Sequence, residues 1–316
     1  MSYSTQPAWR EIQAFLPPEY RLGPGQEPAE EWWAWQGHDI HLDCFRDPDA
    51  PAKVILFHGV GTNGRQLSTI LGAPLHHRGL ETIAVDMPEY GLTRVAAGAR
   101  VRYDDWVQAG ADLVEAELAR DDRPIVLYGL SAGGMLAYHV ASVTGRVAGI
   151  VGMCFLDQSV QQVADETALN VAMSRVGAPL VRVTARTPLS GVRMPMRVAS
   201  KMHTLVNDKA ALKACLRDRT SAGNAMTMTF LDSYIAYRPA VGPEEFDVCP
   251  ILLAQPGEDR WTPQHLSDLF LDRIHQVPVR TVVLEGASHY PMEQPGLDQL
   301  VDAVESFVGQ QVAPTG

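Results

Sequence analysis

The chain has 316 residues, of which 46% are hydrophobic and 20% are charged. These values are typical of a globular protein with a large core, built as one elaborated domain or as one domain with an inserted segment. With 26 basic and 37 acidic residues the formal net charge is −11. This balance argues against a nucleic-acid partner or a generally anionic-membrane-binding surface, and leaves room for a local basic patch. Arginines do gather around 182–197 and 217–219, and we interpret those segments as solvated helix faces.

The termini and the cysteines favour an intracellular protein. The first residues contain neither the basic segment nor the apolar run of a signal peptide, and no stretch reaches the length of a membrane span. Four scattered cysteines follow no metal-ligand spacing, so buried thiols are expected rather than disulfides. We therefore expect a cytoplasmic protein with no stable membrane anchor and no metal.

Residues 1–30 are rich in Pro and Gly and predict an N-terminal arm with one short helix near residues 9–15. Alternation around Gln36-Gly37 predicts a hairpin over 31–45. Strand-like segments then alternate with helical ones, the clearest helix being 103–120. The expected strands are 54–59, 82–85, 124–128, 147–156, 250–255 and 279–285. This order predicts a mostly parallel central sheet with helices on both faces.

Residues 158–247 interrupt the alternation. The segment contains methionines at irregular spacing, is broken by prolines and shows no convincing strand. We expect a helical cap inserted between two halves of an α/β core, 31–157 and 248–316. Flexible methionines suit an adaptable apolar wall, although any single one is more easily explained as filling the core of the cap itself. After the cap, Thr262-Pro263 predicts the start of a helix reaching residue 275, and a closing helix is expected over 293–308.

The segment Ile125–Gly134 organises the prediction of function. Gly129-Leu-Ser131-Ala-Gly133 has the Gly-x-Ser-x-Gly pattern between a buried strand and a helix. Such a turn holds the serine hydroxyl above the carboxyl end of the sheet and directs the N–H of Ala132 at the group that the serine attacks. An ordinary tight turn explains the five residues alone, but the flanking elements and the downstream partners favour a nucleophile.

The loop Gly59-Val60-Gly61-Thr62-Asn63-Gly64 has two interpretations. It satisfies Gly-x-Gly-x-x-Gly with an acidic residue, Asp86, about twenty positions on, as dinucleotide sites do. It also suits an oxyanion loop, in which the glycines let the N–H of Val60 approach a tetrahedral intermediate. Because a cofactor and the serine turn would compete for one crevice, we favour the oxyanion loop and expect no cofactor.

Two later loops complete the predicted chemistry. Asp259 follows the strand at 250–255, and His289 follows the strand at 279–285. A serine needs a base, which histidine supplies near neutral pH, and the imidazole needs a carboxylate to fix its tautomer. We therefore predict Ser131 as nucleophile, His289 as base and Asp259 as acid, with Val60 and Ala132 as oxyanion donors.

Each assignment has a competitor. Asp157 also ends a strand, and Glu258 neighbours Asp259, so either could be the acid. His139, on the helix after the serine, is expected to be structural, and His76-His77 to end a helix.

These features together resemble the α/β-hydrolase superfamily over residues 35–310, on His58-Gly59, Gly129–Gly133 and the Asp259 and His289 loops. Within it the chain is similar to capped serine esterases of the monoglyceride-lipase, lysophospholipase and serine-aminopeptidase-like type. It departs from them at Glu89, where such enzymes often have Gly in an Asp-x-Pro-Gly-x-Gly loop.

The resemblance implies an enzyme that cleaves carboxylic esters of small apolar molecules through an acyl-enzyme. Acyl transfer, thioester or amide cleavage and carbon–carbon bond hydrolysis would use the same triad. A small-molecule receptor with little turnover is an alternative of a different class.

Overall fold

A computed structural model describes residues 2–312 of the chain. Its largest element is an eight-stranded sheet with the strand order β1-β2-β4-β3-β5-β6-β9-β10. The first two pairings, β1 with β2 and β2 with β4, are antiparallel, and all the others are parallel. The strands are β1 (Ala29–Trp35), β2 (His38–Phe45), β3 (Lys53–Phe57), β4 (Glu81–Val85), β5 (Ile125–Gly129), β6 (Gly149–Gly152), β9 (Ile251–Pro256) and β10 (Val279–Leu284).

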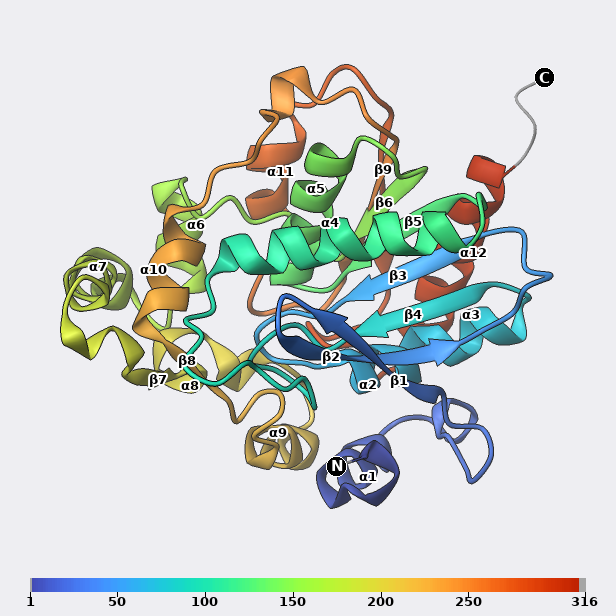
Figure 1. Cartoon of the computed structure of the whole chain (residues 1–316), viewed down its shortest axis with the longest axis horizontal. Coiled ribbons are helices and arrows are strands. Elements are labelled where there is room, and N and C mark those ends of the chain that lie inside the picture. The colour runs from blue at the N-terminus through green and yellow to red at the C-terminus, as the bar shows by residue number, and fades with distance from the viewer. Residues whose placement is uncertain (1, 313–316) are drawn as a thin grey trace.

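Helices cover both faces of this sheet, as predicted. In Figure 1, α4 and α5 lie on one face while α3 and α12 lie on the other. The central strands β3, β4, β5 and β9 are buried along their whole length, because they are covered on both sides. The helices of the core are α2 (Gly64–Leu67), η3 (Ser68–Gly72), α3 (Ala73–His77), α4 (Tyr103–Arg120), α5 (Ala132–Thr144), α11 (His265–Leu271) and α12 (Gly296–Val312).

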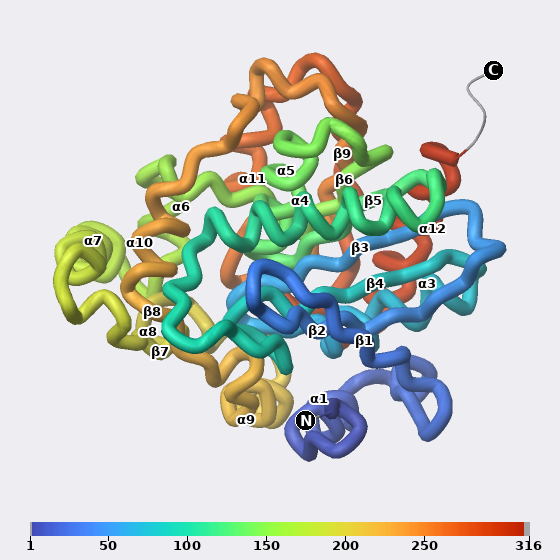
Figure 2. The backbone as a smooth tube through the Cα atoms, in the orientation of Figure 1, coloured from blue at the N-terminus to red at the C-terminus, as the bar shows by residue number. Residues whose placement is uncertain are grey.

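Most of the segment between β6 and β9 lies beside the sheet and forms a layer at the left of Figure 2. Its last turn instead packs against the residues that follow α11. The elements of the segment are α6 (Gln161–Thr167), η4 (Met173–Gly177), α7 (Ala178–Ala185), η5 (Pro188–Gly191), β7 (Arg193–Pro195), α8 (Met196–Ala199), η6 (Met202–Thr204), α9 (Lys209–Arg217), β8 (Ala225–Thr227), α10 (Met228–Ala236) and η7 (Pro243–Glu245). We call this segment the cap, and its expected limits at 158 and 247 stay a prediction.

The expectation that this segment contains no strand is wrong. Strands β7 and β8 pair antiparallel through Arg193 and Thr227, Met194 and Met226, and Pro195 and Ala225. With three residues each, the two strands are too short for a period-two pattern to show in the sequence.

Other predicted elements differ in their limits. The strand expected over 147–156 is regular only at Gly149–Gly152. The helix expected from Thr262 begins at His265, because the Thr262 hydroxyl donates to Asp259 instead of capping a helix.

The N-terminal arm contains η1 (Tyr3–Thr5), α1 (Pro7–Gln13) and η2 (Pro18–Tyr20). Helix α1 packs against α9 of the cap, and Tyr3 and Trp9 are buried. All four cysteines are buried and free. Among residues 2–312, none of the helices combines the length and the apolar character needed to cross a bilayer.

Candidate active site

Ser131 lies at the apex of the turn between β5 and α5. Its backbone has φ 56° and ψ −124°, a left-handed conformation that costs a non-glycine residue about 1–3 kcal/mol and is concentrated at functional sites. The flanking glycines are required by space. A Cβ on Gly129 would lie 1.9 Å from the carbonyl oxygen of Gly133, and a Cβ on Gly133 would lie 2.2 Å from that of Phe57. The structure therefore has the tight strand-to-helix turn that the pattern predicts.

The loop after β3 is held from two sides. The Tyr90 hydroxyl donates to the carbonyl oxygen of Val60 at 2.9 Å. The side chain of His58 spans the loop, because its Nδ1 lies 2.8 Å from the carbonyl oxygen of Gly59 and its Nε2 accepts from the N–H of Met87 at 3.0 Å. Burial lowers the pKa of His58, so the neutral ring with its proton on Nδ1 satisfies both contacts. His58 shapes the loop and is not placed to act as a base.

This loop approaches the serine turn closely. A Cβ on Gly59 would lie 2.6 Å from Cβ of Ser131 and 3.2 Å from the nitrogen of Ala132, so glycine is required there too. Within residues 2–312, neither Val60 nor Ala132 donates its N–H to a backbone carbonyl. Ala132 is the first residue of α5, where amides lack helical partners and the helix dipole favours negative charge. Two such donors beside Ser131 suit a developing oxyanion.

The loops after β9 and β10 bring Asp259 and His289 together. His289 Nδ1 lies 2.8 Å from Asp259 Oδ2, and both side chains are almost completely buried. Burial disfavours the Asp259 carboxylate, but the charge and hydrogen bond of His289 and the hydrogen bonds of Thr262 outweigh it and lower the pKa of Asp259 to about 2. The other ring nitrogen, His289 Nε2, is buried and has no hydrogen-bond partner among the described residues. The carboxylate thus holds the Nδ1–H tautomer and leaves the Nε2 lone pair free.

Thr262 is predicted to start a helix, but in the structure it holds Asp259. Its hydroxyl donates to Asp259 Oδ2 at 2.7 Å, and its N–H donates to Oδ1 at 2.9 Å. The N–H of Trp261 donates to the same Oδ1 at 2.7 Å. The loop itself therefore orients the acid, which a Thr-Pro pair in the sequence does not reveal.

The competing residues lie elsewhere. Asp157 accepts the N–H of Ser159 at 2.8 Å in a local turn, and Glu258 is exposed. The ring of His139 lies 3.1 Å from the Tyr103 hydroxyl, and burial lowers the pKa of His139 to about 3. Asp259 is therefore the carboxylate that contacts His289.

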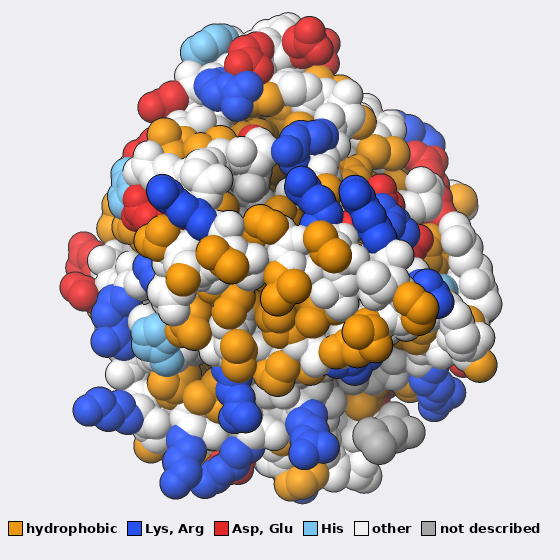
Figure 3. Space-filling model, turned by 90° about the vertical axis from the view of Figure 1, so that its left-hand side faces the viewer, with side chains coloured by type: hydrophobic (Ala, Val, Ile, Leu, Met, Phe, Trp, Pro, Cys, Tyr) orange, Lys and Arg blue, Asp and Glu red, His pale blue; other side chains and the backbone are white. Residues whose placement is uncertain are grey.

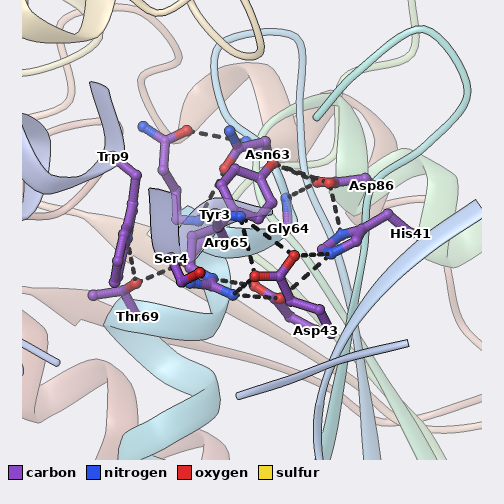
Figure 4. Close-up of polar contacts among 12 residues, drawn as sticks. Tyr3, Ser4, Trp9, His41, Asp43, Asn63, Gly64, Arg65, Thr69 and Asp86 are labelled. Atoms are coloured by element: carbon purple, nitrogen blue, oxygen red, sulfur yellow. Dashed lines mark hydrogen bonds and ion pairs between the residues drawn. The ribbon is translucent and has the colours of Figure 1, made fainter. Parts of the chain in front are cut away.

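A buried polar cluster surrounds Gly64 and Arg65, at the end of the Val60 loop in the chain (Figure 4). Arg65, fully buried after the loop, pairs with Asp43 at 2.5 and 2.8 Å. Its guanidinium lies 4.8 Å from the ring centroid of Tyr3 and 4.7 Å from that of Trp9. Two residues of the N-terminal arm thus cover the charge that anchors the loop.

Asp86 belongs to the same cluster and has a structural role. Its carboxylate accepts the Gly64 N–H at 2.7 Å and the Tyr3 hydroxyl at 2.9 Å, and it lies 2.9 Å from Nδ1 of His41. Burial disfavours the protonated His41 ring, but Asp86 and Glu30 outweigh it and raise the pKa of His41 to about 10. The acidic residue of the dinucleotide pattern is therefore used to hold the loop.

Glu89 keeps the backbone that favours glycine, with φ 74°. Its carboxylate lies 3.3 Å from Arg193 of β7, and its carbonyl oxygen accepts from the Asn224 side chain at 2.8 Å. Glu89, which stands where related enzymes often have Gly, thus joins the core to the cap.

A cavity of about 860 Å³, including space open to solvent, lies between the core and the cap. Its wall is mostly apolar, and half of the cap methionines singled out in the sequence take part. The core contributes Val60, Ser131, Ala132 and Trp261, and the cap contributes among others Met173, Val181, Met194, Met196, Leu231 and Tyr234. The Trp261 ring also packs on His289, with centroids 4.7 Å apart. Ser131 and both predicted oxyanion donors thus line the cavity, and the His289–Asp259 pair lies behind Trp261 of its wall.

Solved structures with the same fold confirm the architecture. A monoglyceride lipase from Saccharomyces cerevisiae, solved as a soluble variant with a substrate analogue, aligns with a TM-score of 0.74 at 14% identity, over 94% of this chain and 98% of that one. A monoacylglycerol lipase from Paleococcus ferrophilus aligns with 0.67 at 17% identity, over 86% and 99%. A carboxylesterase from Bacillus subtilis aligns with 0.58 at 16% identity, over 95% of both chains.

Sequence comparison gives a weaker match and a decisive one. Protein phosphatase methylesterase 1 from Bos taurus is 26% identical over 151 residues, which are 43% of this chain and 40% of that protein. The model of a protein family described as "Alpha/beta hydrolase family" matches residues 54–303, which include the Val60 loop, Ser131, Asp259 and His289. The chain therefore belongs to the alpha/beta hydrolase family.

Proposed function

We propose that this hydrolase cleaves carboxylic esters of small apolar molecules through a serine acyl-enzyme, as a capped esterase of the monoglyceride-lipase or lysophospholipase type. One observation carries the proposal. His289 presents a buried, unpartnered Nε2 while Asp259 holds its Nδ1. A buried nitrogen without a hydrogen-bond partner is costly in a native protein. A role for Nε2 as the base that deprotonates Ser131 when substrate is bound explains why it is kept without a partner.

The mechanism follows from these positions. Ser131 Oγ attacks the ester carbonyl while His289 Nε2 takes its proton, and Asp259 stabilises the imidazolium. The N–H groups of Val60 and Ala132 stabilise the oxyanion. His289 then returns the proton to the departing alcohol, which leaves an acyl group on Ser131. Water, deprotonated by His289, then attacks the acyl group; as the bond to Ser131 Oγ breaks, His289 returns the proton to Oγ and the carboxylic acid is released.

The cavity supports an apolar substrate. Methionine, valine and leucine side chains from the cap line it together with Ser131, and concave, mostly apolar sites are the rule for small-molecule ligands. The yeast and archaeal neighbours are named as lipases of monoglycerides, and the mammalian relative as a methylesterase. Transfer of the acyl group to another acceptor, or cleavage of a thioester or amide, would use the same residues.

A fluorophosphonate probe tests the nucleophile. We expect wild type to be labelled and Ser131→Ala to lose both the label and turnover of a p-nitrophenyl ester, with kcat lowered by about 10⁴–10⁶. Ser174, another serine lining the cavity, is the matched control, and Ser174→Ala should remain labelled. Near-wild-type turnover by Ser131→Ala would contradict the serine mechanism. Labelling without turnover of any ester would favour a receptor.

A further inference from the structure

The cap exposes an unusual amount of apolar side chain to solvent. Seven of the thirteen large exposed hydrophobic residues among 2–312 lie between residues 171 and 198. The four most exposed of all are among them: Val176 (68%), Leu180 (63%), Val183 (62%) and Leu189 (60%). Figure 3, which views the molecule from the side of α7, shows hydrophobic side chains gathered at the centre of this face with Lys and Arg around them.

The charges of this segment are all of one sign. Residues 167–207 contain five Arg and one Lys and neither Asp nor Glu, in a chain with a net charge of −11. Arg175, Arg182 and Arg193 lie within 4 Å of acidic residues of other segments and are nonetheless about half exposed. Arg186 and Arg197 are exposed and form no ion pair within the described residues. We call this surface, from Arg175 to Arg197, the cationic apolar face.

This face is the outer side of the cavity wall. Met173, Gly177 and Val181 of η4 and α7 line the cavity. Val176 and Leu180, which lie between them in the chain, and Val183, which follows, face solvent. A surface helix ordinarily pairs one apolar stripe with one polar stripe. Here a single helical layer is apolar on both sides, and it separates the cavity from the exterior.

We propose that the cationic apolar face docks the protein on an anionic lipid surface. Exposed aliphatic side chains ringed by arginines have the two chemistries of such a surface, because the acyl-chain boundary takes the apolar residues and anionic headgroups attract the basic ones. Docking would place the cavity wall directly against the lipid surface, which contains apolar molecules. A second copy of the chain fits less well, because the acids beside this face already pair with three of its arginines and would leave Arg186 and Arg197 of both copies uncompensated. The binding step does not depend on the chemistry proposed for Ser131.

Vesicle co-sedimentation tests this inference on the full chain carrying Ser131→Ala, so that no lipid is hydrolysed. We expect binding to vesicles of phosphatidylcholine and phosphatidylglycerol in equal amounts, weak binding to phosphatidylcholine alone, and loss of binding as salt is raised. Val176→Glu with Leu180→Glu should lower the partition coefficient at least about tenfold, and so should Arg186→Glu with Arg197→Glu.

The matched controls lie on strand β10, where Val283 is 51% exposed and Arg280 is exposed. Val283→Glu and Arg280→Glu should bind vesicles as the parent does. Unchanged melting temperatures show that all variants are folded. Equal loss in the β10 variants, or binding that ignores lipid charge and salt, would overturn the inference. Absence of vesicle binding would also overturn it, and sedimentation velocity would then show whether a dimer that Leu180→Glu disrupts uses this face instead.

Discussion

The two walls of the cavity are held by different forces. On the core side, the Val60 loop rests on short polar contacts from Tyr90, His58 and Asp86, all fully buried. On the cap side, η4 contributes Met173 and α7 contributes Val181 to the cavity. Their outward residues meet solvent, and their arginines make exposed contacts such as Arg182 to Asp232 at 3.8 Å.

The core-side wall is therefore suited to holding donors in fixed positions, and the cap-side wall to accepting apolar groups of different shape. Stabilising an oxyanion requires donors fixed to within a few tenths of an ångström, which buried hydrogen bonds provide. Accepting an apolar group requires a wall of suitable volume, which flexible thioethers and small side chains provide. We therefore expect core-side substitutions to change rate and stability strongly, and cap-side substitutions to change substrate preference or surface binding.

The largest effect is expected at the acid. Asp259→Asn should lower kcat by about 10⁴, because an amide cannot hold the Nδ1–H tautomer of His289 or stabilise the imidazolium. Steady-state kinetics with a p-nitrophenyl ester measures this. Asp157→Asn should keep most of the activity, since Asp157 contacts Ser159 and not His289. If Asp157→Asn lost activity and Asp259→Asn kept it, the catalytic acid would be Asp157, at the end of the strand before the cap.

The second-largest effect is expected on stability, at Arg65, which supports the Val60 loop. Arg65→Met leaves Asp43 buried without its bidentate partner, so we expect the free energy of unfolding to fall by about 3–5 kcal/mol. Urea denaturation measures this. Arg182→Met in the cap removes an exposed pair of 3.8 Å and should change stability by about 0.5 kcal/mol or less. Similar losses in both variants would remove the distinction between the two walls.

The sequence indicated where the proposed catalytic residues lie better than it indicated the residues that support them. Ser131, Asp259 and His289 each follow a recognisable strand, so their meeting at one edge of the sheet follows from topology. Tyr3 and Asp86 are 83 positions apart, and no local pattern connects such residues. The arginines at 182–197 are exposed as expected, but Val183, Leu189 and Val192 among them are exposed too. Helical periodicity reports an apolar face without telling whether protein or solvent meets it.

A pH measurement sharpens the description of the buried cluster. The pKa of His41 is raised to about 10, against about 6.5 in an unfolded chain. Its stabilisation is therefore fully present below about pH 6.5 and is lost as the pH rises toward 10, an effect of about 3 kcal/mol between pH 7 and 10. His41→Gln should be less stable than wild type at pH 7 and should lack this component of the alkaline decline. Parallel stability curves for the two proteins would show that His41 carries no stabilising charge.

The smallest effect is expected on the cap side, where Ala178 lines the cavity at the start of α7. Each methylene buried against an apolar wall adds up to about 0.8 kcal/mol, so kcat/KM of wild type should rise along a series of acyl esters until the cavity is full. Ala178→Leu occupies part of that space. We expect its optimum to move about two or three carbons shorter and kcat/KM for the longest esters to fall about tenfold, with the acetate ester little changed.

Ala210→Leu is the matched control, because Ala210 is exposed on α9 and does not line the cavity. Its chain-length profile should equal that of wild type. A uniform fall of kcat/KM for all esters in Ala178→Leu would mean that the substitution disturbs the core-side wall, and an unchanged profile would mean that the acyl chain lies elsewhere. A shifted optimum with unchanged turnover of the shortest ester would show that the cap wall sets preference while the core wall sets rate.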